Sequence, residues 1–339
     1  MKGTPIGGFF ALELPTAKGG VHQFWSGKHP TACFVNARSA LAALIAAERP
    51  QKVWLPAFLC SALADAVPTG LRRYYSVGSN LSPQVSALEE VRGGEMVVGI
   101  DYFGWLPSPD FLDFVSARPD VLFVEDCSHC LAPEEPGWGG WRLFSPRKLL
   151  GVVDGGILVA VGHGLQVPQP KQVNANSGSQ WQAPLLRFED EAQDYERLWH
   201  SANQAKEELM GVSDSAMTRL SCTLLQLIEP KPLIERRMAN FLALEAELAP
   251  WMLPLRRRPG PAPFTFPLRL NESQRDPLLE CLFSERIFAA VHWRDLPSPV
   301  ECFPIEHQLA KELISLPCDH RYGADDMSRI VQTVLRALA

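Results

Sequence analysis

The chain has 339 residues, of which 46% are hydrophobic and 21% charged; this length and composition are typical of a folded protein with two domains. Its formal net charge of −6 argues against nucleic acid as the main partner, because binding to phosphates requires a basic surface. No apolar run reaches the roughly 20 residues of a membrane helix, and the N-terminal residues lack the apolar core of a signal peptide. We therefore expect a cytoplasmic protein that binds neither nucleic acid nor membrane.

The first predicted helix follows Asn36 and runs over Ala37–Ile45. Asn36 or Ser39 could cap this helix, and the small residues at its start would leave backbone N–H groups open to an anion. An ordinary capped helix of the core explains the same pattern. This segment by itself leaves both interpretations open.

Between residues 51 and 160, short hydrophobic runs alternate with segments of helical periodicity. The runs are β-branched or aromatic and are bounded by Pro, Gly or Asp, which predicts strands. The predicted strands are Lys52–Leu55, Arg72–Ser76, Met96–Ile100, Val121–Val124 and Gly156–Val161, and the predicted helices are Ser61–Val67, Val85–Val91 and Pro109–Ala117. The alternation predicts an α/β fold with a mostly parallel central sheet and helices on both faces. Ligands of such sheets bind beyond the carboxyl ends of the strands, where Asp101 and Asp126 would lie.

The remainder of the chain has a different pattern. The segment Val161–Gln182 is rich in Gly, Gln, Pro, Asn and Ser, which predicts a loop or linker. The elements predicted after it are a helical region from about Leu185 to Leu227, a helix over Pro230–Leu248, two short strands around Phe264–Leu270, a helix near Asp276–Ser284 and a terminal helix over Ala324–Leu338. We therefore expect a large domain with connecting helices over residues 1–230 and a smaller α+β C-terminal domain over 231–339.

Eight cysteines are scattered along the chain, as expected for thiols in a reducing compartment. Cys127 and Cys130 form a C-x-x-C motif with His129 between the two cysteines. A structural zinc site would need a second ligand pair at similar spacing, and the sequence contains none. We therefore expect buried thiols and no metal.

The segment from residue 124 to 156 suggests a chemical function. Asp126 ends a hydrophobic run, and Ser145 and Lys148 follow as a Ser-x-x-Lys after a turn-rich insert. This order is typical of a pyridoxal phosphate site. A carboxylate would keep the pyridine nitrogen protonated, a serine and a helix N-terminus would bind the phosphate, and a lysine would form the Schiff base. Arg147 could bind phosphate, act on Lys148 through its charge, or be an ordinary surface arginine.

Several segments resemble the DegT/StrS family of sugar aminotransferases, which belongs to fold type I of the pyridoxal phosphate enzymes. These segments are Asn36-Ala37-Arg38-Ser39-Ala40-Leu41, Leu55-Pro56-Ala57-Phe58, Tyr102-Phe103-Gly104, Glu125-Asp126-Cys127-Ser128-His129, Phe144-Ser145 through Lys148 with Gly155-Gly156, and Ser315-Leu316-Pro317. The resemblance covers nearly the whole chain, and its most specific segments lie between residues 36 and 156.

The resemblance implies roles for individual residues. Lys148 would be the Schiff-base lysine and would carry the proton between substrate and cofactor. Asp126 would pair with the pyridinium nitrogen, and His129, where the family usually has glutamine, would lie near the phenolic oxygen of the cofactor. The phosphate would be bound by Ser145 and the backbone of Ala37 and Arg38.

The aromatic residue that stacks on the cofactor is less clearly marked in the sequence. Phe58, Tyr102 and Phe103 are candidates, and we assign Phe58 to the cofactor site, although core packing is the commoner role of such residues. The family usually has Thr-Phe where this chain has Leu59-Cys60. In addition, no asparagine clearly matches the one that the neighbouring subunit contributes in the family.

The resemblance implies transfer of an amino group from an amino acid donor to a keto sugar, nucleotide-linked in this family, by a homodimer with shared active sites. Two alternatives remain open: another pyridoxal phosphate reaction, as in a dehydratase or lyase, and an inactive fold type I protein that serves in binding. Relatives that dehydrate sugars are expected to have replaced the lysine, so Lys148 favours transfer. In the second domain, Val291–Arg294 could face the substrate or lie half-buried between the domains.

Overall fold

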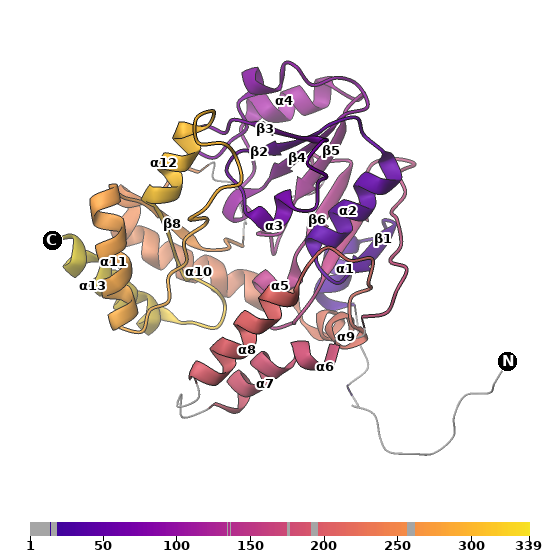
Figure 1. Ribbon diagram of the computed structural model, residues 1–339. Coiled ribbons are helices and arrows are strands. Elements are labelled where there is room, and N and C mark those ends of the chain that lie inside the picture. The colour runs from indigo at the N-terminus through magenta and orange to yellow at the C-terminus, as the bar shows by residue number, and fades with distance from the viewer. Residues whose placement is uncertain are drawn as a thin grey trace, which may run out of the picture.

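The computed structural model describes residues 14, 19–133, 135, 137–174, 177–190, 196–255 and 262–339. Its centre is a seven-stranded sheet (Figure 1). The strands are β1 (Thr31–Phe34), β2 (Val53–Pro56), β3 (Arg72–Tyr75), β4 (Met96–Ile100), β5 (Leu122–Asp126), β6 (Trp141–Phe144) and β7 (Gly156–Ala160). Their order is β1-β7-β6-β5-β4-β2-β3; the strands from β6 to β3 run parallel, whereas β7 is antiparallel to both its neighbours. The predicted α/β class with a mostly parallel central sheet is therefore confirmed.

Helices pack around this sheet and form most of the C-terminal third (Figure 1). The α-helices that precede residue 228 are α1 (Gly20–Ser26), α2 (Ala37–Glu48), α3 (Ser61–Ala64), α4 (Pro109–Ala117), α5 (Pro146–Leu149), α6 (Ser177–Gln180), α7 (Gln182–Glu189), α8 (Glu196–Leu209) and α9 (Arg219–Leu227). The later elements are α10 (Pro230–Leu248), β8 (Phe266–Arg269), α11 (Glu272–Ser284), α12 (Pro304–Glu312), β9 (Leu313–Leu316) and α13 (Ala324–Leu338). Short 3-10 helices cover Val85–Leu88, Tyr102–Gly104 and Ala249–Trp251.

Most of the predicted elements of the sheet region are present. The five predicted strands are β2, β3, β4, β5 and β7, each within two residues at either end, and the helices predicted at 109–117, 230–248 and 324–338 are α4, α10 and α13. Some predictions were wrong in detail. The helix expected over residues 61–67 ends at Ala64, and the helix α6 lies within the predicted loop. Residues 85–91 contain a short 3-10 helix in place of an α-helix, and the two strands expected around 264–270 are one strand, β8, whose partner β9 comes from residues 313–316.

The strands β1 and β6 were not predicted from the sequence. The strand β6 was missed because it contains a buried arginine. Arg142 lies at the centre of this four-residue strand, which is buried throughout. Its Nε atom lies 3.2 Å from Oε2 of Glu125 on the neighbouring strand β5, and its Nη1 contacts Glu135. The backbone N–H groups of Trp138 and Gly139 also donate to Glu125 Oε2. This pairing compensates for the burial of the arginine, which a pattern of hydrophobic residues cannot reveal.

The terminal helix α13 shows how the C-terminal elements are held. Its buried residues Met327, Ile330, Val331 and Val334 recur at helical spacing and form one stripe, which packs on α10 and α11. These helices and the β8–β9 pair lie beside the seven-stranded sheet (Figure 1). Buried side chains from both regions form one continuous hydrophobic cluster. The two regions therefore meet along a packed seam.

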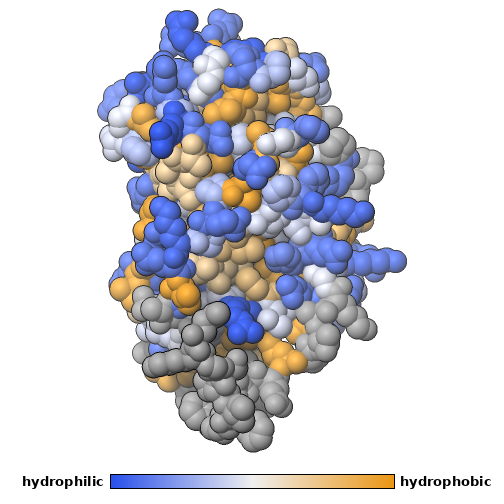
Figure 2. Space-filling model, turned by 90° about the vertical axis from the view of Figure 1, so that its right-hand side faces the viewer, coloured by the Kyte–Doolittle hydropathy of each residue, from blue (hydrophilic) through white to orange (hydrophobic). Residues whose placement is uncertain are grey.

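The described part of the surface is mixed in character. On the face seen in Figure 2, hydrophobic side chains are interspersed with hydrophilic ones. None of the described helices is both long enough and apolar enough to cross a membrane.

Candidate functional site

Five of the predicted cofactor-site residues meet at the carboxyl edge of the sheet. Asp126 is the last residue of β5, Ser145 directly follows β6, and Lys148 lies on the short helix α5. Ala37 and Arg38 form the first turn of α2, which follows β1. These five residues line one cavity, together with Asn36, Cys60, Ala62, Leu63, Ser128 and Arg147. Residues far apart in the sequence are thus assembled because parallel strands end at a common edge.

Asp126 is an acidic residue with few polar partners. Its side chain is buried, and Oδ1 accepts a hydrogen bond of 2.9 Å from the Ser128 N–H. Burial raises the pKa of the Asp126 carboxyl, whereas the charge of Lys148 and the bonds from Ser128 lower that pKa. A buried carboxylate that faces a cavity fits a cationic ring nitrogen. The residues present therefore match the group that the sequence predicts.

His129 contacts Lys148 directly. The two side chains approach at 3.2 Å between His129 Nε2 and Lys148 Nζ, and the Phe103 N–H donates to His129 Nδ1 at 3.3 Å. An Nδ1 that accepts a hydrogen bond assigns the proton of the neutral imidazole to Nε2, the atom that faces the lysine. Burial, followed by the charges of Lys148 and His292, holds the pKa of His129 well below its usual range. The imidazole is therefore neutral at physiological pH.

The backbone around this histidine is held in an uncommon conformation. Phe103 has a φ of 56°, in the left-handed region, and this turn directs its N–H at the imidazole. On the other side, the ring of Phe264 stacks on His129 with centroids 4.3 Å apart. Because Phe264 belongs to the C-terminal third of the chain, the orientation of His129 depends on both regions of the fold.

The start of α2 lines the cavity and packs against Gly156, the first residue of β7. The side chain of Asn36 caps the helix by accepting from the Ser39 N–H at 2.9 Å, so Asn36 is the cap residue. A Cβ atom on Gly156 would lie 2.1 Å from the Asn36 carbonyl carbon, so only glycine permits this approach. Arg38 contributes backbone here, because its Nη1 donates to the Met210 carbonyl at 2.8 Å.

Phe58, which was also predicted to belong to the cofactor site, is placed differently. Phe58 is fully buried outside this cavity, where its ring packs against Tyr102 and Trp293 with centroid distances of 5.9 and 5.5 Å. Cys60, which stands where the family usually has an aromatic residue, lines the cavity instead. Arg147 lines the cavity too, and its Nη1 pairs with Glu207 of α8.

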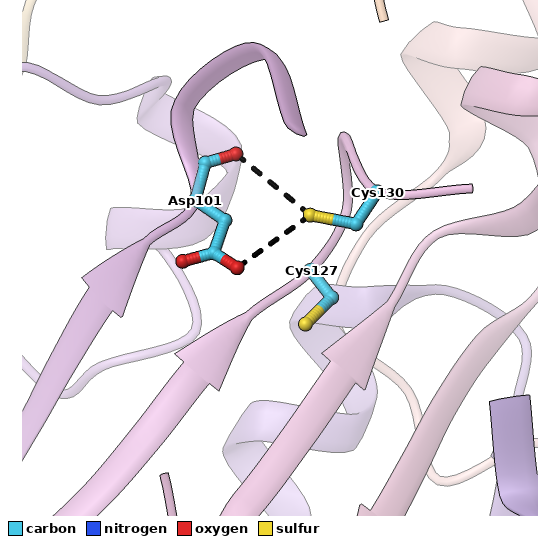
Figure 3. A group of neighbouring side chains, drawn as sticks. All are labelled: Asp101, Cys127 and Cys130. Atoms are coloured by element: carbon cyan, nitrogen blue, oxygen red, sulfur yellow. Dashed lines mark hydrogen bonds between the residues drawn. The ribbon is translucent and has the colours of Figure 1, made fainter. Parts of the chain in front are cut away.

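The C-x-x-C motif follows the end of β5, and its two cysteines lie beside Asp101 (Figure 3). The ligand atoms of Asp101, Cys127 and Cys130 all lie within 4.8 Å of one another. The Cys130 thiol donates to Asp101 Oδ2 at 3.7 Å, and Trp138 Nε1 donates to Oδ1 at 3.0 Å. Burial raises the pKa of the Cys127 thiol well above its usual value. Among the described residues this group offers three ligands, whereas a structural zinc site uses four.

A second cavity, of about 310 Å³, adjoins Lys148 on the side of the C-terminal elements. Its lining includes Arg237, His292, His320 and Arg321, of which only His292 belongs to a segment singled out from the sequence. His320 and Arg321 closely follow Ser315-Leu316-Pro317, so their position after a matching segment was an available signal. Arg237 offered none, because only the packing of α10 shows that this arginine is buried.

Solved structures of aminotransferases share this architecture. Spr1654 of Streptococcus pneumoniae, described as a sugar aminotransferase, has 14% sequence identity and a TM-score of 0.69 over 96% of this chain and 90% of its own. DesV of S. venezuelae has 15% sequence identity and a TM-score of 0.67 over 94% of this chain and 87% of its own. A DegT DnrJ EryC1 StrS aminotransferase from Brucella abortus has 15% sequence identity and a TM-score of 0.65 over 93% of this chain and 87% of its own. This chain has the fold of these aminotransferases. No family model and no curated protein matches the sequence.

The comparison confirms the predicted fold over almost the whole chain. At 14% and 15% identity, however, it is the side chains of this protein that must support any conclusion about its chemistry.

Proposed function

We propose that this protein is a pyridoxal phosphate-dependent aminotransferase that moves an amino group from an amino acid donor to a keto sugar. The observation that carries the proposal is the single cavity lined by Asp126, Ser145, Lys148 and the first turn of α2. A carboxylate, a hydroxyl, an amine and a helix N-terminus are the groups that this cofactor requires. Structural neighbours support the assignment, since Spr1654 has been solved in a PLP form and a PMP form.

Each residue would have a separate task. When bound, pyridoxal phosphate supplies the electron sink for amino transfer. Asp126 would hold the ring nitrogen through a charge-assisted hydrogen bond, and Ser145 with the backbone of Ala37 and Arg38 would bind the phosphate. The Lys148 amine would hold the cofactor at its aldehyde carbon, and Nζ would carry a proton to and from the substrate carbon.

His129 would act beside Lys148. Its Nε2–H faces Lys148 Nζ at 3.2 Å, and its ring cannot easily turn, because Phe264 stacks on it and the Phe103 N–H binds the opposite nitrogen. A neutral imidazole in this position can donate a hydrogen bond to Lys148 Nζ when that nitrogen is uncharged, because an ammonium group has no acceptor, and it adds no second positive charge.

The test is covalent capture of the cofactor. Purified protein should be yellow after incubation with pyridoxal phosphate, and borohydride should fix the cofactor to Lys148 as a stable secondary amine that peptide mass spectrometry locates. The Lys148→Ala variant should show neither capture nor transamination. Lys171→Ala, which removes an exposed lysine, is the matched control and should behave as the wild type. A colourless wild-type protein that cannot be reconstituted would refute the proposal.

We also propose, from the sequence resemblance, that the acceptor is nucleotide-linked and that the protein acts as a homodimer in the cytoplasm. The division into a large domain over residues 1–230 and a small one over 231–339 is part of the same proposal. Light scattering on the purified protein tests the dimer, and limited proteolysis tests the boundary.

A further inference from the structure

The ends of strands β4 and β5 carry a group of side chains that the proposed cofactor does not use. Asp101 directly follows β4, and Cys127 and Cys130 belong to the turn that follows β5 (Figure 3). All three side chains are buried, and their ligand atoms lie within 4.8 Å of one another. Two sulfur atoms and a carboxylate oxygen that converge in this way are donors for a metal ion.

The backbone fixes the positions of these donors. The Cys130 N–H donates to the Cys127 carbonyl at 2.8 Å, which closes the turn between the two cysteines. The Cys127 N–H in turn donates to the Leu143 carbonyl of β6 at 2.8 Å, and the Asp101 N–H donates to the Asp126 carbonyl of β5 at 3.1 Å. The three side chains therefore project from backbone that is held by hydrogen bonds at the edge of the sheet.

The separation of the donor atoms fits a small tetrahedral ion. Cys130 Sγ lies 3.7 Å from Asp101 Oδ2. Zinc bonds of about 2.3 Å to sulfur and about 2.0–2.2 Å to oxygen place neighbouring ligands about 3.6 Å apart. Trp138 Nε1 donates to the other carboxylate oxygen, Asp101 Oδ1, at 3.0 Å, as outer hydrogen bonds commonly do around metal ligands. The fourth position would be taken by water, as in other zinc sites with three protein ligands.

A divalent ion also suits the charge of this buried group. In the metal-free protein the Cys130 thiol donates to Asp101, and burial raises the pKa of the Cys127 thiol well above its usual value, so both sulfur atoms hold protons. Cysteine binds metal as the thiolate, and one divalent ion would therefore replace two protons. The net charge of the group is the same before and after this exchange, so metal binding leaves no additional uncompensated charge in the interior.

We propose that Asp101, Cys127 and Cys130 bind one zinc ion. The sequence by itself predicted no metal, because it has no second ligand pair at the spacing of the C-x-x-C motif; the third ligand comes instead from the neighbouring strand. The ion would tie the ends of β4 and β5 together beside Asp126 and His129, which are sequence neighbours of the two cysteines. This inference does not depend on the amino transfer proposed above.

The other chemistry open to two neighbouring cysteines is a disulfide. Oxidants attack the thiolate, and buried thiols are inert for this reason. A disulfide would also remove the hydrogen bond from Cys130 to the Asp101 carboxylate, whereas a metal ion would contact all three side chains. The structure therefore favours the metal ion.

The metal content of the purified protein tests this site. Because the ligands are buried, the ion has to enter during folding. The protein is therefore produced in minimal medium that contains zinc chloride or cobalt chloride, and it is purified without chelators or metal-affinity resin. Elemental analysis should find about one zinc ion per chain. The cobalt-grown protein should show a thiolate-to-cobalt charge-transfer band in the near ultraviolet and the visible bands of a tetrahedral ion.

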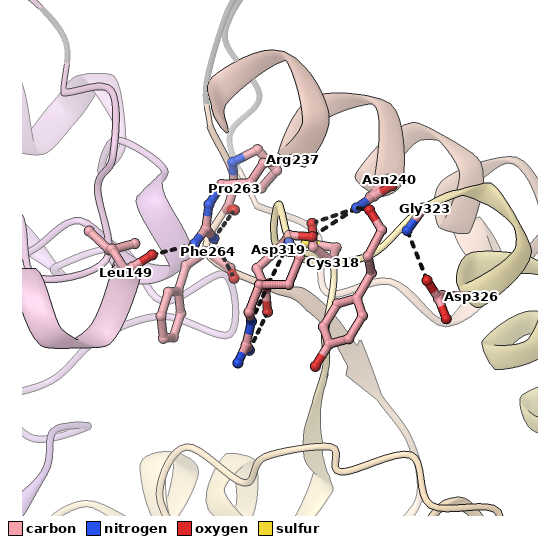
Figure 4. A network of polar contacts seen from close by, with 11 residues as sticks. Leu149, Arg237, Asn240, Pro263, Phe264, Cys318, Asp319, Gly323 and Asp326 are labelled. Carbon is pink, nitrogen blue, oxygen red and sulfur yellow. Dashed lines mark hydrogen bonds and ion pairs between the residues drawn. The ribbon is translucent and has the colours of Figure 1, made fainter. Parts of the chain in front are cut away.

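Substitutions that remove one ligand should remove the ion. Cys127→Ser, Cys130→Ser and Asp101→Asn preserve the size of the side chain and should each lower the metal content at least about tenfold. Cys318→Ser is the matched control, because Cys318 is buried as well but lies in the polar network of Figure 4, where its carbonyl accepts from Asn240 at 3.4 Å. This variant should retain the ion.

Several results would overturn the inference. These are wild-type protein that contains no metal from either medium, bound cobalt without a thiolate band, unchanged metal content in the folded cysteine variants, and a Cys127–Cys130 disulfide found by peptide mass spectrometry. If one cysteine variant does not fold, as judged by circular dichroism, the other variant and the wild-type spectrum decide the outcome. Metal bound as expected by a protein that cannot capture pyridoxal phosphate on Lys148 would refute the proposed function alone.

Discussion

Replacing Asp126 by asparagine should have opposite effects on stability and on activity. In cofactor-free protein the carboxyl is buried and receives hydrogen bonds from Ser128. Its raised pKa means that the native state favours the protonated acid, so native stability decreases as the pH rises through that pKa. An asparagine at this position would keep the shape of the side chain and the acceptor for Ser128 but carry no charge. The variant should therefore be more stable than the wild type at neutral pH.

The size of this gain in stability follows from the burial of the Asp126 carboxyl. Desolvation of a buried polar group costs about 1–3 kcal/mol and more when the group is charged, so we expect a gain of about 1–3 kcal/mol in the free energy of unfolding for Asp126→Asn at pH 7.5. Thermal unfolding of the cofactor-free proteins from pH 4 to pH 8 measures it. The gain should vanish toward about pH 4, near the ordinary pKa of aspartate, because the wild-type carboxyl is then neutral as well.

Activity should change in the opposite direction. Removal of one member of a buried charge pair costs about 3–5 kcal/mol, which corresponds to a loss of about a hundredfold or more in transamination rate. Asp154→Asn is the matched control, because that buried carboxylate accepts from the Thr218 N–H and hydroxyl at 2.8 and 2.9 Å and its neutralisation should reduce stability. An Asp126→Asn protein that is less stable than the wild type, or fully active, would show that the reasoning is wrong.

Two further substitutions test the surroundings of the site. His129→Gln should make stability less sensitive to acid: the lowered pKa of His129 stabilises the native state above about pH 6.5, and this contribution is lost as the pH falls. The difference in melting temperature between variant and wild type should therefore change between pH 7.5 and 5. His292, whose pKa is about 4, remains in both proteins and does not contribute to this difference. A difference that is independent of pH would contradict a neutral, buried His129. Gly156→Ala should destabilise by about 1–3 kcal/mol or more, because its Cβ would lie 2.1 Å from backbone of Asn36. Gly70→Ala, which meets nothing within 4 Å, should change the denaturation midpoint little, and equal effects of the two substitutions would refute the steric argument.

The local sequence was sufficient to predict those helices and strands whose physical signal extends over only a few residues. The strand β4 and the helices α4, α10 and α13 were predicted at their observed bounds, because hydrophobic periodicity and flanking Pro, Gly and Asp act over a few residues. The grouping of Asp126, Ser145 and Lys148 followed from chain order in an α/β fold, since parallel strands present their carboxyl ends at one edge.

Elements whose stability depends on a distant partner were not predictable in this way. The strand β6 contains Arg142, which is tolerated because Glu125 of β5 lies beside it. The strand β9 pairs with β8 from more than 40 residues earlier. Neither partner is visible in a short window of sequence, and each strand is only four residues long.

The sequence by itself determined the fold class and the chemical groups at the edge of the sheet, because these depend on periodicity and on residue type. Only the tertiary structure decided which neighbours those groups have. Packing placed His129 against Lys148 and under Phe264, put Cys60 rather than Phe58 in the cavity wall, and buried Arg237 without a counter-charge beside it. The physical reason is that burial and hydrogen bonding, which set the charge state and reach of a side chain, depend on segments that are distant in sequence.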